Sequence, residues 1–69
     1  MEQITLIAPD ISCDHCIASI QKAVTKLNSV RFLKGDSAAK QVTVEYDPSQ
    51  VELAAIEKVM EEEGYPVAP

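Results

Sequence analysis

The stretch Asp10-Ile11-Ser12-Cys13-Asp14-His15-Cys16 joins a strand-like run of residues to a helical pattern, and it contains both cysteines of the chain. Before it, apolar residues alternate from position 4 to position 8, the period of a strand with one buried face, and Pro9 ends that strand because it has no N–H. After it, apolar residues recur at the spacing of one helical face, at Ile17, Ile20, Val24 and Leu27. The cysteines are therefore predicted to lie where a strand gives way to a helix.

The ends of this first helix carry polar residues suited to capping. Ser12 and Asp14 both have side chains that can cap its start. Asn28 follows the last residue of the apolar stripe and can adopt the left-handed conformation that stops a helix.

The middle of the chain predicts a hairpin. Val42, Val44 and Tyr46 alternate with polar residues as a clear strand. The strand before it, from Val30 to Leu33, has a blurred pattern, and Gly35 indicates a bulge or an early end. A short polar link joins the two, so we expect them to pair.

The last third predicts a second helix and a final strand. Ser49-Gln50-Val51-Glu52 has the form of a capping box, with Ser49 as the N-cap. Apolar residues continue at helical spacing as far as Met60, and Gly64 is placed to stop the helix. Tyr65-Pro66-Val67 is then predicted to be a short strand.

The predicted order of elements is strand, helix, strand, strand, helix, strand. This is the ferredoxin-like βαββαβ arrangement of the α+β class, with two helices on one face of a four-stranded antiparallel sheet. Sixty-nine residues are enough for one small core, so residues 1–69 are predicted to form a single domain that begins and ends as a complete protein.

Net charge, the lengths of the apolar runs and the N-terminal residues argue against several functions and indicate where in the cell the protein acts. A net charge of −5 argues against nucleic-acid binding, which needs a basic face. No apolar run approaches the roughly 20 residues needed to span a bilayer, and the N-terminus lacks the features of a signal peptide. We therefore expect a cytoplasmic protein whose thiols stay reduced.

Two cysteines three residues apart form a compact pair of sulfur ligands. The start of a helix favours thiolate, and soft thiolates select soft cations such as Cu(I), Zn(II) or Hg(II). A closed structural zinc site needs four ligands, whereas this chain has two cysteines and one histidine. Cys13 and Cys16 are thus predicted to hold one low-coordinate ion, with Cu(I) favoured, and to leave it open to a sulfur from another molecule.

The chain resembles the heavy-metal-associated domain, and within it the small free-standing bacterial copper chaperones. The resemblance covers nearly the whole length, through the Cys-x-x-Cys loop, the helix after it, the stretch Val42–Pro48 and the ending Glu63–Val67. It implies that Cys13 and Cys16 bind Cu(I) and that no enzymatic reaction is catalysed. It also implies transfer by thiolate exchange to the metal-binding domain of a copper-transporting P-type ATPase, or to another copper acceptor.

The resemblance assigns roles to two apolar or aromatic residues. Family members usually have Gly-Met ahead of the first cysteine, where this chain has Asp10 and Ile11, and Ile11 can replace the methionine as an apolar plug under the loop. Tyr65 corresponds to an aromatic residue that packs beneath the metal site. It is predicted to be a core residue, with its hydroxyl near the sulfurs as a second possibility.

Two alternatives stay open. The same fold can carry Zn(II), Cd(II) or Hg(II), with Asp10 or Asp14 adding a hard oxygen ligand that favours zinc. Cys-x-x-Cys is also a thiol–disulfide redox motif, although the chain is short for a thioredoxin core and has no tryptophan. His15 is predicted to be a solvated loop residue; otherwise it tunes the thiolates or takes part in a metal-bridged homodimer.

Overall fold

The computed structural model describes residues 1–68 and contains two helices and three strands. In chain order these are β1 (Glu2–Ile7), α1 (Asp14–Thr25), β2 (Val30–Asp36), β3 (Gln41–Tyr46) and α2 (Leu53–Glu62).

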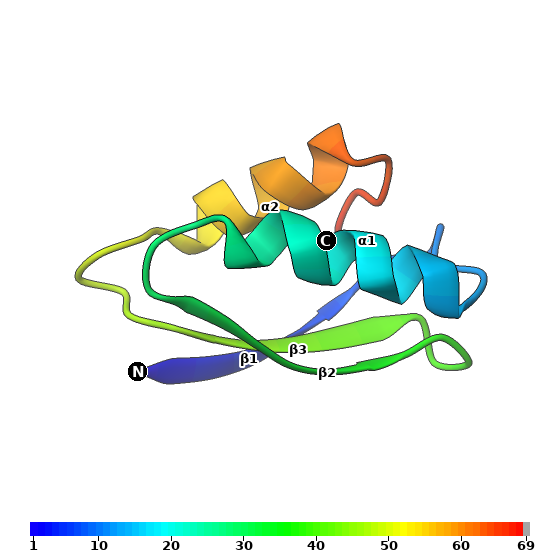
Figure 1. Cartoon of the computed structure of the whole chain (residues 1–69), viewed down its shortest axis with the longest axis horizontal. Helices are drawn as coiled ribbons and strands as arrows, with labels where there is room; N and C mark the ends of the chain where they lie inside the picture. The colour runs from blue at the N-terminus through cyan, green and yellow to red at the C-terminus, as the bar shows by residue number, and fades with distance from the viewer. Residues whose placement is uncertain (69) are drawn as a thin grey trace.

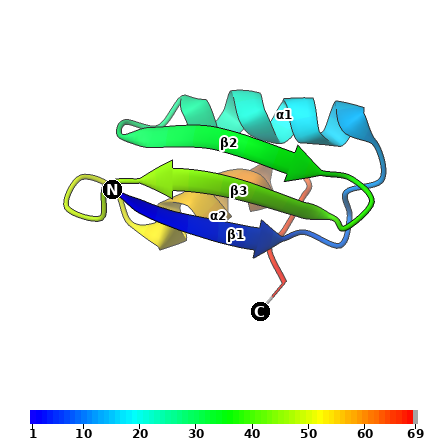
Figure 2. The same cartoon turned by 90° about the horizontal axis from the view of Figure 1, so that it is seen from below.

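The three strands form one antiparallel sheet with the order β1-β3-β2. Both helices lie on the same face of this sheet (Figure 1), and the view from below shows the strands in front of them (Figure 2). The structure therefore confirms the α+β class and the placement of the helices. The strand order is that of the ferredoxin-like arrangement.

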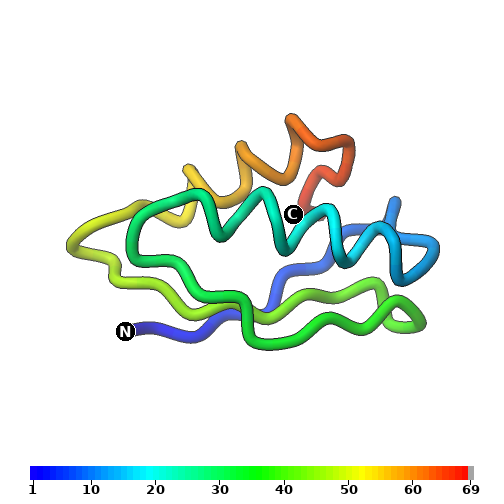
Figure 3. The backbone as a smooth tube through the Cα atoms, viewed as in Figure 1, coloured from blue at the N-terminus to red at the C-terminus, as the bar shows by residue number. Residues whose placement is uncertain are grey.

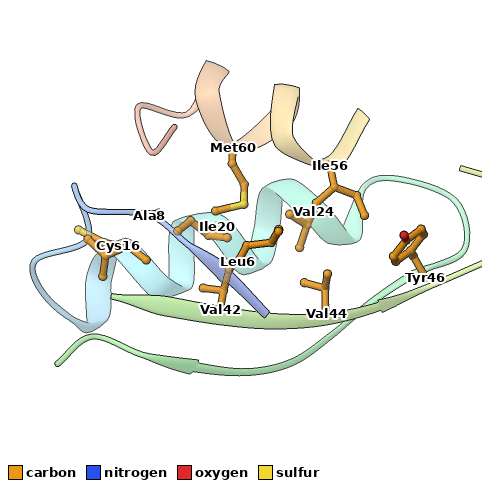
Figure 4. Packing of buried hydrophobic residues seen from close by; sticks show 11 residues of the cluster. Leu6, Ala8, Cys16, Ile20, Val24, Val42, Val44, Tyr46, Ile56 and Met60 are labelled. Atoms are coloured by element: carbon orange, nitrogen blue, oxygen red, sulfur yellow. The ribbon is translucent and has the colours of Figure 1, made fainter. Parts of the chain in front are cut away.

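The apolar core lies between the sheet and the helices. Leu6, Val42 and Val44 point from the sheet toward Ile20 and Val24 of α1, as the alternation and the helical spacing predict (Figure 4). Two residues of α2, Ile56 and Met60, close the core from above and are fully buried. Burial of each such side chain is worth about 1.5–3 kcal/mol, so this packing is the main source of stability.

Gly35 lies within β2 and does not end it. The pairing of β2 with β3 shifts between Phe32 and Lys34, so the bulge lies two residues before the glycine at which it was predicted. A Cβ atom at Gly35 would stand 2.5 Å from Cγ2 of Ile17 on α1. The glycine is therefore required because the first turns of α1 pack directly on the backbone of β2.

The predicted caps of the helices are partly wrong. The N-cap of α2 is Glu52, without a side-chain hydrogen bond, because the Ser49 hydroxyl donates to Asp47 Oδ1 at 2.7 Å and stabilises a turn before the helix. The N-cap of α1 is Cys13, and neither Ser12 nor Asp14 caps it.

The exit from α1 also differs from the prediction. The left-handed residue after the helix is Ser29, with φ of 64°, and not Asn28. The Ser29 carbonyl accepts a hydrogen bond from the Asp47 N–H at 3.1 Å, which ties this turn to the end of β3.

Gly64 ends α2 as predicted. Its φ of 94° is left-handed, its N–H donates to the carbonyl of Glu61, and the next N–H, of Tyr65, donates to that of Met60. This pair of bonds is the Schellman motif. It fixes the direction in which the chain leaves the helix, and so the position of Tyr65.

The predicted fourth strand at residues 65–67 is not confirmed. After α2 the chain turns back toward the sheet (Figure 3), and it meets β1 through one hydrogen bond, from the Ala68 N–H to the Ile7 carbonyl at 2.7 Å. The N–H of Tyr65 is already used by the helix end and Pro66 has none, so a ladder cannot start earlier.

Within residues 1–68, neither helix has the length and apolar composition to cross a bilayer.

Replacing Gly35 with alanine tests the close approach of α1 to β2. Alanine is ordinarily the better strand residue, but here overpacking against Ile17 should lower the free energy of unfolding by about 1–3 kcal/mol, measured by urea denaturation. Combining Gly35→Ala with Ile17→Ala removes the clashing atoms, so the loss in the double variant should be smaller than the sum of the two single losses. Additive losses would contradict this account of the glycine.

Candidate metal centre

Cys13 and Cys16 lie at the start of α1. Cys13 is the N-cap residue, in extended conformation, and Cys16 is the third residue of the first helical turn. The two sulfurs are 3.9 Å apart, and both thiols are free. The loop between β1 and α1, residues 8–13 (the cysteine loop), therefore brings the predicted pair together.

The two cysteines differ in their access to solvent. Cys13 is exposed, whereas Cys16 is 9% exposed and lies at the end of the apolar core next to the cysteine loop (Figure 4). Beneath the loop, Ile11 is fully buried and fills the position of the predicted plug. Of the two cysteines predicted to leave an ion open to a sulfur from another molecule, only Cys13 is exposed.

The Cys16 thiol is held in a set of hydrogen-bond donors that lower its pKa from 9.0 to about 6. The largest contribution is the hydroxyl of Tyr65, followed by the backbone amide and the hydroxyl of Ser12, whose Oγ lies 3.7 Å from the sulfur. The Cys13 backbone adds to these, and burial opposes them. Donors aimed at sulfur stabilise the charged form, so Cys16 is a thiolate at neutral pH.

Tyr65 reaches the sulfur from the segment that follows α2. Its pKa is raised, chiefly by the interaction of its hydroxyl with Cys16 and also by partial burial. Ser19 hydrogen-bonds to the same hydroxyl and acts in the opposite direction. Tyr65 packs against the apolar core, the first of the two roles predicted for it, and its hydroxyl lowers the pKa of the Cys16 thiol.

Ser12 and Ser19 lie near the cysteine pair and Tyr65, and the sequence does not predict their contribution to the pKa values there. Ser12 was expected to cap the helix, but its donors serve the sulfur instead. Ser19 is three residues after Cys16 and therefore lies on the same helical face, which is the signal that was available.

The remaining predicted residues lie around the pair without joining it. Asp14 accepts a hydrogen bond from the Ser37 hydroxyl at 3.2 Å, and Asp10 and His15 are exposed. In the described part of the chain, no group of three or more Cys, His, Asp or Glu side chains is placed to hold a metal ion. The geometry provides two sulfur ligands.

The distance between the sulfurs suits a single shared ion. With metal–sulfur bonds of about 2.3 Å, sulfurs 3.9 Å apart can bind one ion at a sulfur–metal–sulfur angle of about 116°. A third ligand can then approach from the side of the exposed Cys13.

Known proteins are similar to this chain in sequence and in fold. The family model for the heavy-metal-associated domain matches residues 5–66. The chain is 34% identical over 68 residues to a Bacillus subtilis (strain 168) protein named copper chaperone CopZ, covering 99% of each. It is similar to a solved structure named CopZ metallochaperone, with a TM-score of 0.90 and 28% identity over 97% of this chain and 100% of that one. It is also similar to the water-soluble region of the P-type ATPase CopA from Bacillus subtilis, with a TM-score of 0.85 and 30% identity, over 96% of this chain and 44% of that chain.

The tyrosine–thiolate contact can be tested by titrating Cys16 in the metal-free Cys13→Ser variant. Thiolate absorbance should appear with a pKa of about 6, and adding Tyr65→Phe should raise that pKa because the largest donor is lost. Tyr46→Phe, which removes the hydroxyl of the other tyrosine, should leave it unchanged. A thiol that titrates near 9.0 with Tyr65 present would contradict the described contact.

The same pKa predicts how stability depends on pH. The folded pKa of Cys16 lies below its unfolded value, so between about 6 and 9.0 the unfolded chain binds more protons than the folded chain. The free energy of unfolding of the metal-free protein should therefore rise with pH across this window and fall as pH drops through 6. Tyr65→Phe should flatten that rise in urea denaturation curves, and an unchanged slope would contradict it.

Proposed function

The chain belongs to the heavy-metal-associated domain family, and we propose that it is a copper chaperone that carries one Cu(I) ion on Cys13 and Cys16. The observation that carries this proposal is a pair of free sulfurs 3.9 Å apart, one exposed and one buried. Soft thiolates favour Cu(I), and two ligands leave the ion open to exchange.

The charge of the site supports Cu(I) as the bound ion. Two thiolates and Cu(I) form a complex with a net charge of −1. The hydroxyls of Tyr65 and Ser12 and the loop amides at Cys16 are donors that favour negative charge on sulfur. Donors of this kind stabilise the loaded site without becoming ligands.

Unequal exposure of the two sulfurs supports transfer by thiolate exchange. A thiolate of the acceptor bonds to the ion on the side of Cys13, and the bond to Cys13 then breaks. A second acceptor thiolate displaces Cys16 last, because that sulfur is buried and held by Tyr65. Copper stays Cu(I) throughout, so no oxidant or reductant is needed.

The acceptor we propose is the metal-binding domain of a copper-transporting P-type ATPase. The likeness between this chain and the soluble region of CopA supports it, because domains of one fold can present matching cysteine loops to each other. Another copper acceptor, or a second copy of this chain in a metal-bridged homodimer, would use the same exchange. We propose that residues 1–69 act as one module, in the cytoplasm and without enzymatic activity.

Removing either cysteine tests the ligand set. Cys13→Ser and Cys16→Ser should each lower Cu(I) affinity by more than the roughly 10–100-fold that loss of a supporting contact causes, measured anaerobically in competition with a chromogenic chelator. Wild-type protein should bind one ion per chain. Ser49→Ala, in the turn between β3 and α2 at the opposite end of the molecule from the cysteine loop (Figure 1), is the matched control. Retained tight binding in either cysteine variant would refute the proposed ligands.

Competition between Cu(I) and Zn(II) tests the choice of metal. Cu(I) should displace Zn(II), and Asp10→Ala and Asp14→Ala should change neither affinity, because neither carboxylate belongs to a metal-holding group. Zinc affinity that depends on an aspartate, with copper bound no better, would favour the Zn(II) alternative. Insulin reduction at a rate comparable to a thioredoxin would instead favour the redox alternative.

A further inference from the structure

The turn between β2 and β3 lies at the same end of the molecule as the cysteine loop (Figures 1 and 2). Three contacts join them. The Lys40 ammonium donates to the carbonyl of Ile11, the Lys40 carbonyl accepts from the Ala8 N–H at 2.9 Å, and the Ser37 hydroxyl donates to Asp14 Oδ1. The backbone contact continues the antiparallel pairing of β1 and β3 one pair beyond Ile7 and Gln41, whereas the two side-chain contacts are additional to that pairing.

We propose that Lys40 is a positioning residue for the cysteine pair. Its ammonium fixes the carbonyl of Ile11, and thereby the path of the chain through Ser12 to Cys13. The part of this inference that concerns metal release rests on the proposed function. The part that concerns the loop does not.

The turn is rigid enough to serve as an anchor. The Asp36 carboxylate accepts hydrogen bonds from the backbone N–H groups of Ala38 and Ala39, at 3.0 and 3.1 Å, so the turn is closed by its own side chain. β2 and β3 continue directly from it in the sheet. Lys40 therefore projects from a part of the chain that is fixed on both sides.

The backbone of Lys40 supports a role for its side chain. Its φ is 58°, in the left-handed region that favours glycine or asparagine over residues with long side chains. A lysine is the less stable choice for the turn itself. Its side chain makes a charge-assisted hydrogen bond to the cysteine loop, which neither glycine nor asparagine can reach to make.

Ile11 transmits the contact to the site. Its side chain is fully buried and its N–H donates to the Ala8 carbonyl at 3.0 Å, so its carbonyl is the group that Lys40 holds. One residue, Ser12, separates it from Cys13, and the Ser12 hydroxyl lies 3.7 Å from the Cys16 sulfur. A shift of the Ile11 carbonyl therefore moves this hydroxyl and a proposed ligand together.

The hydrogen bond from Ser37 to Asp14 holds the chain on the other side of Cys13. Asp14 is the first residue of α1, and its carboxylate is bonded by Ser37 from the same turn. The β2–β3 turn is thus hydrogen-bonded to the chain on both sides of Cys13. The bond from Ser37 to Asp14 is solvent-exposed, whereas the bond from Lys40 to the Ile11 carbonyl is partly buried, so the Lys40 bond is the stronger of the two.

Amide hydrogen exchange in the metal-free full-length chain tests the loop. In Lys40→Met, exchange at the Ile11 amide should quicken about tenfold, the effect of losing one hydrogen bond from a charged group. The amides of α2 should exchange as in the wild type. Lys40→Arg, which keeps a cationic donor, should restore slow exchange, and Lys58→Met is the matched loss of a lysine on α2. Unchanged exchange at Ile11, or faster exchange throughout α2, would overturn the inference.

Copper release tests the consequence for the site. Removal of Cu(I) from loaded Lys40→Met by excess chelator should be about tenfold faster than from wild type, the low end of the effect of a supporting contact on a metal site.

Lys40→Asn suits the left-handed backbone, so it should leave thermal stability unchanged or higher and still release copper faster. Release rates that follow thermal stability, or that equal the wild-type rate, would overturn positioning by Lys40. Wild-type protein that binds no Cu(I) would refute the proposed function, while amide exchange would still decide the role of Lys40 in the loop.

Discussion

The Tyr65 hydroxyl lowers the pKa of the Cys16 thiol, and it thereby connects the two halves of the chain at the candidate metal centre. This influence depends on the packing of α1 on the sheet with Cys16 in its first turn. It also requires that α2 end at Gly64, where a left-handed residue turns the chain back and delivers Tyr65. The elements far from the sulfurs therefore contribute to the site by fixing the two ends of this contact.

The packing that makes the site also makes its two sulfurs unequal. Cys16 lies at the edge of the core and is stabilised as a thiolate, whereas Cys13 is at the N-cap position and faces solvent. In the function we propose, the buried Cys16 would retain the ion, and the exposed Cys13 would be replaced by a thiolate of another molecule. The two cysteines can be held firmly while the proposed ion has only two ligands from this chain. This is possible because hydrogen bonds and apolar contacts, and not further metal ligands, hold the cysteines in place.

Much of this arrangement could be predicted from the sequence because it depends on periodicity. The alternation around Leu6 and Val44 and the helical stripe through Ile20 have one physical solution, a sheet covered by helices. The cysteine pair was likewise recognisable from its spacing and its place between a strand and a helix. Gly64 was a correct stop because few residues other than glycine adopt its backbone conformation readily.

Several of the predictions that were wrong concern side chains with more than one possible polar partner. Ser12 and Ser49 were expected to cap helices, but a sulfur and a carboxylate were nearer in space. The fourth strand was predicted from three residues, and the use of the Tyr65 N–H by the end of α2 could not be read from composition. The requirement for Gly35 depends on Ile17, eighteen positions earlier, and only the packed structure brings them together.

The central claim is that two sulfurs, with no nitrogen or oxygen ligand from this chain, hold the ion. X-ray absorption at the copper edge of protein loaded anaerobically with one equivalent of Cu(I) tests it most directly. The account predicts a first shell of sulfur alone, at about the 2.3 Å typical of metal–thiolate bonds. A shell that contained imidazole nitrogen or carboxylate oxygen would contradict it.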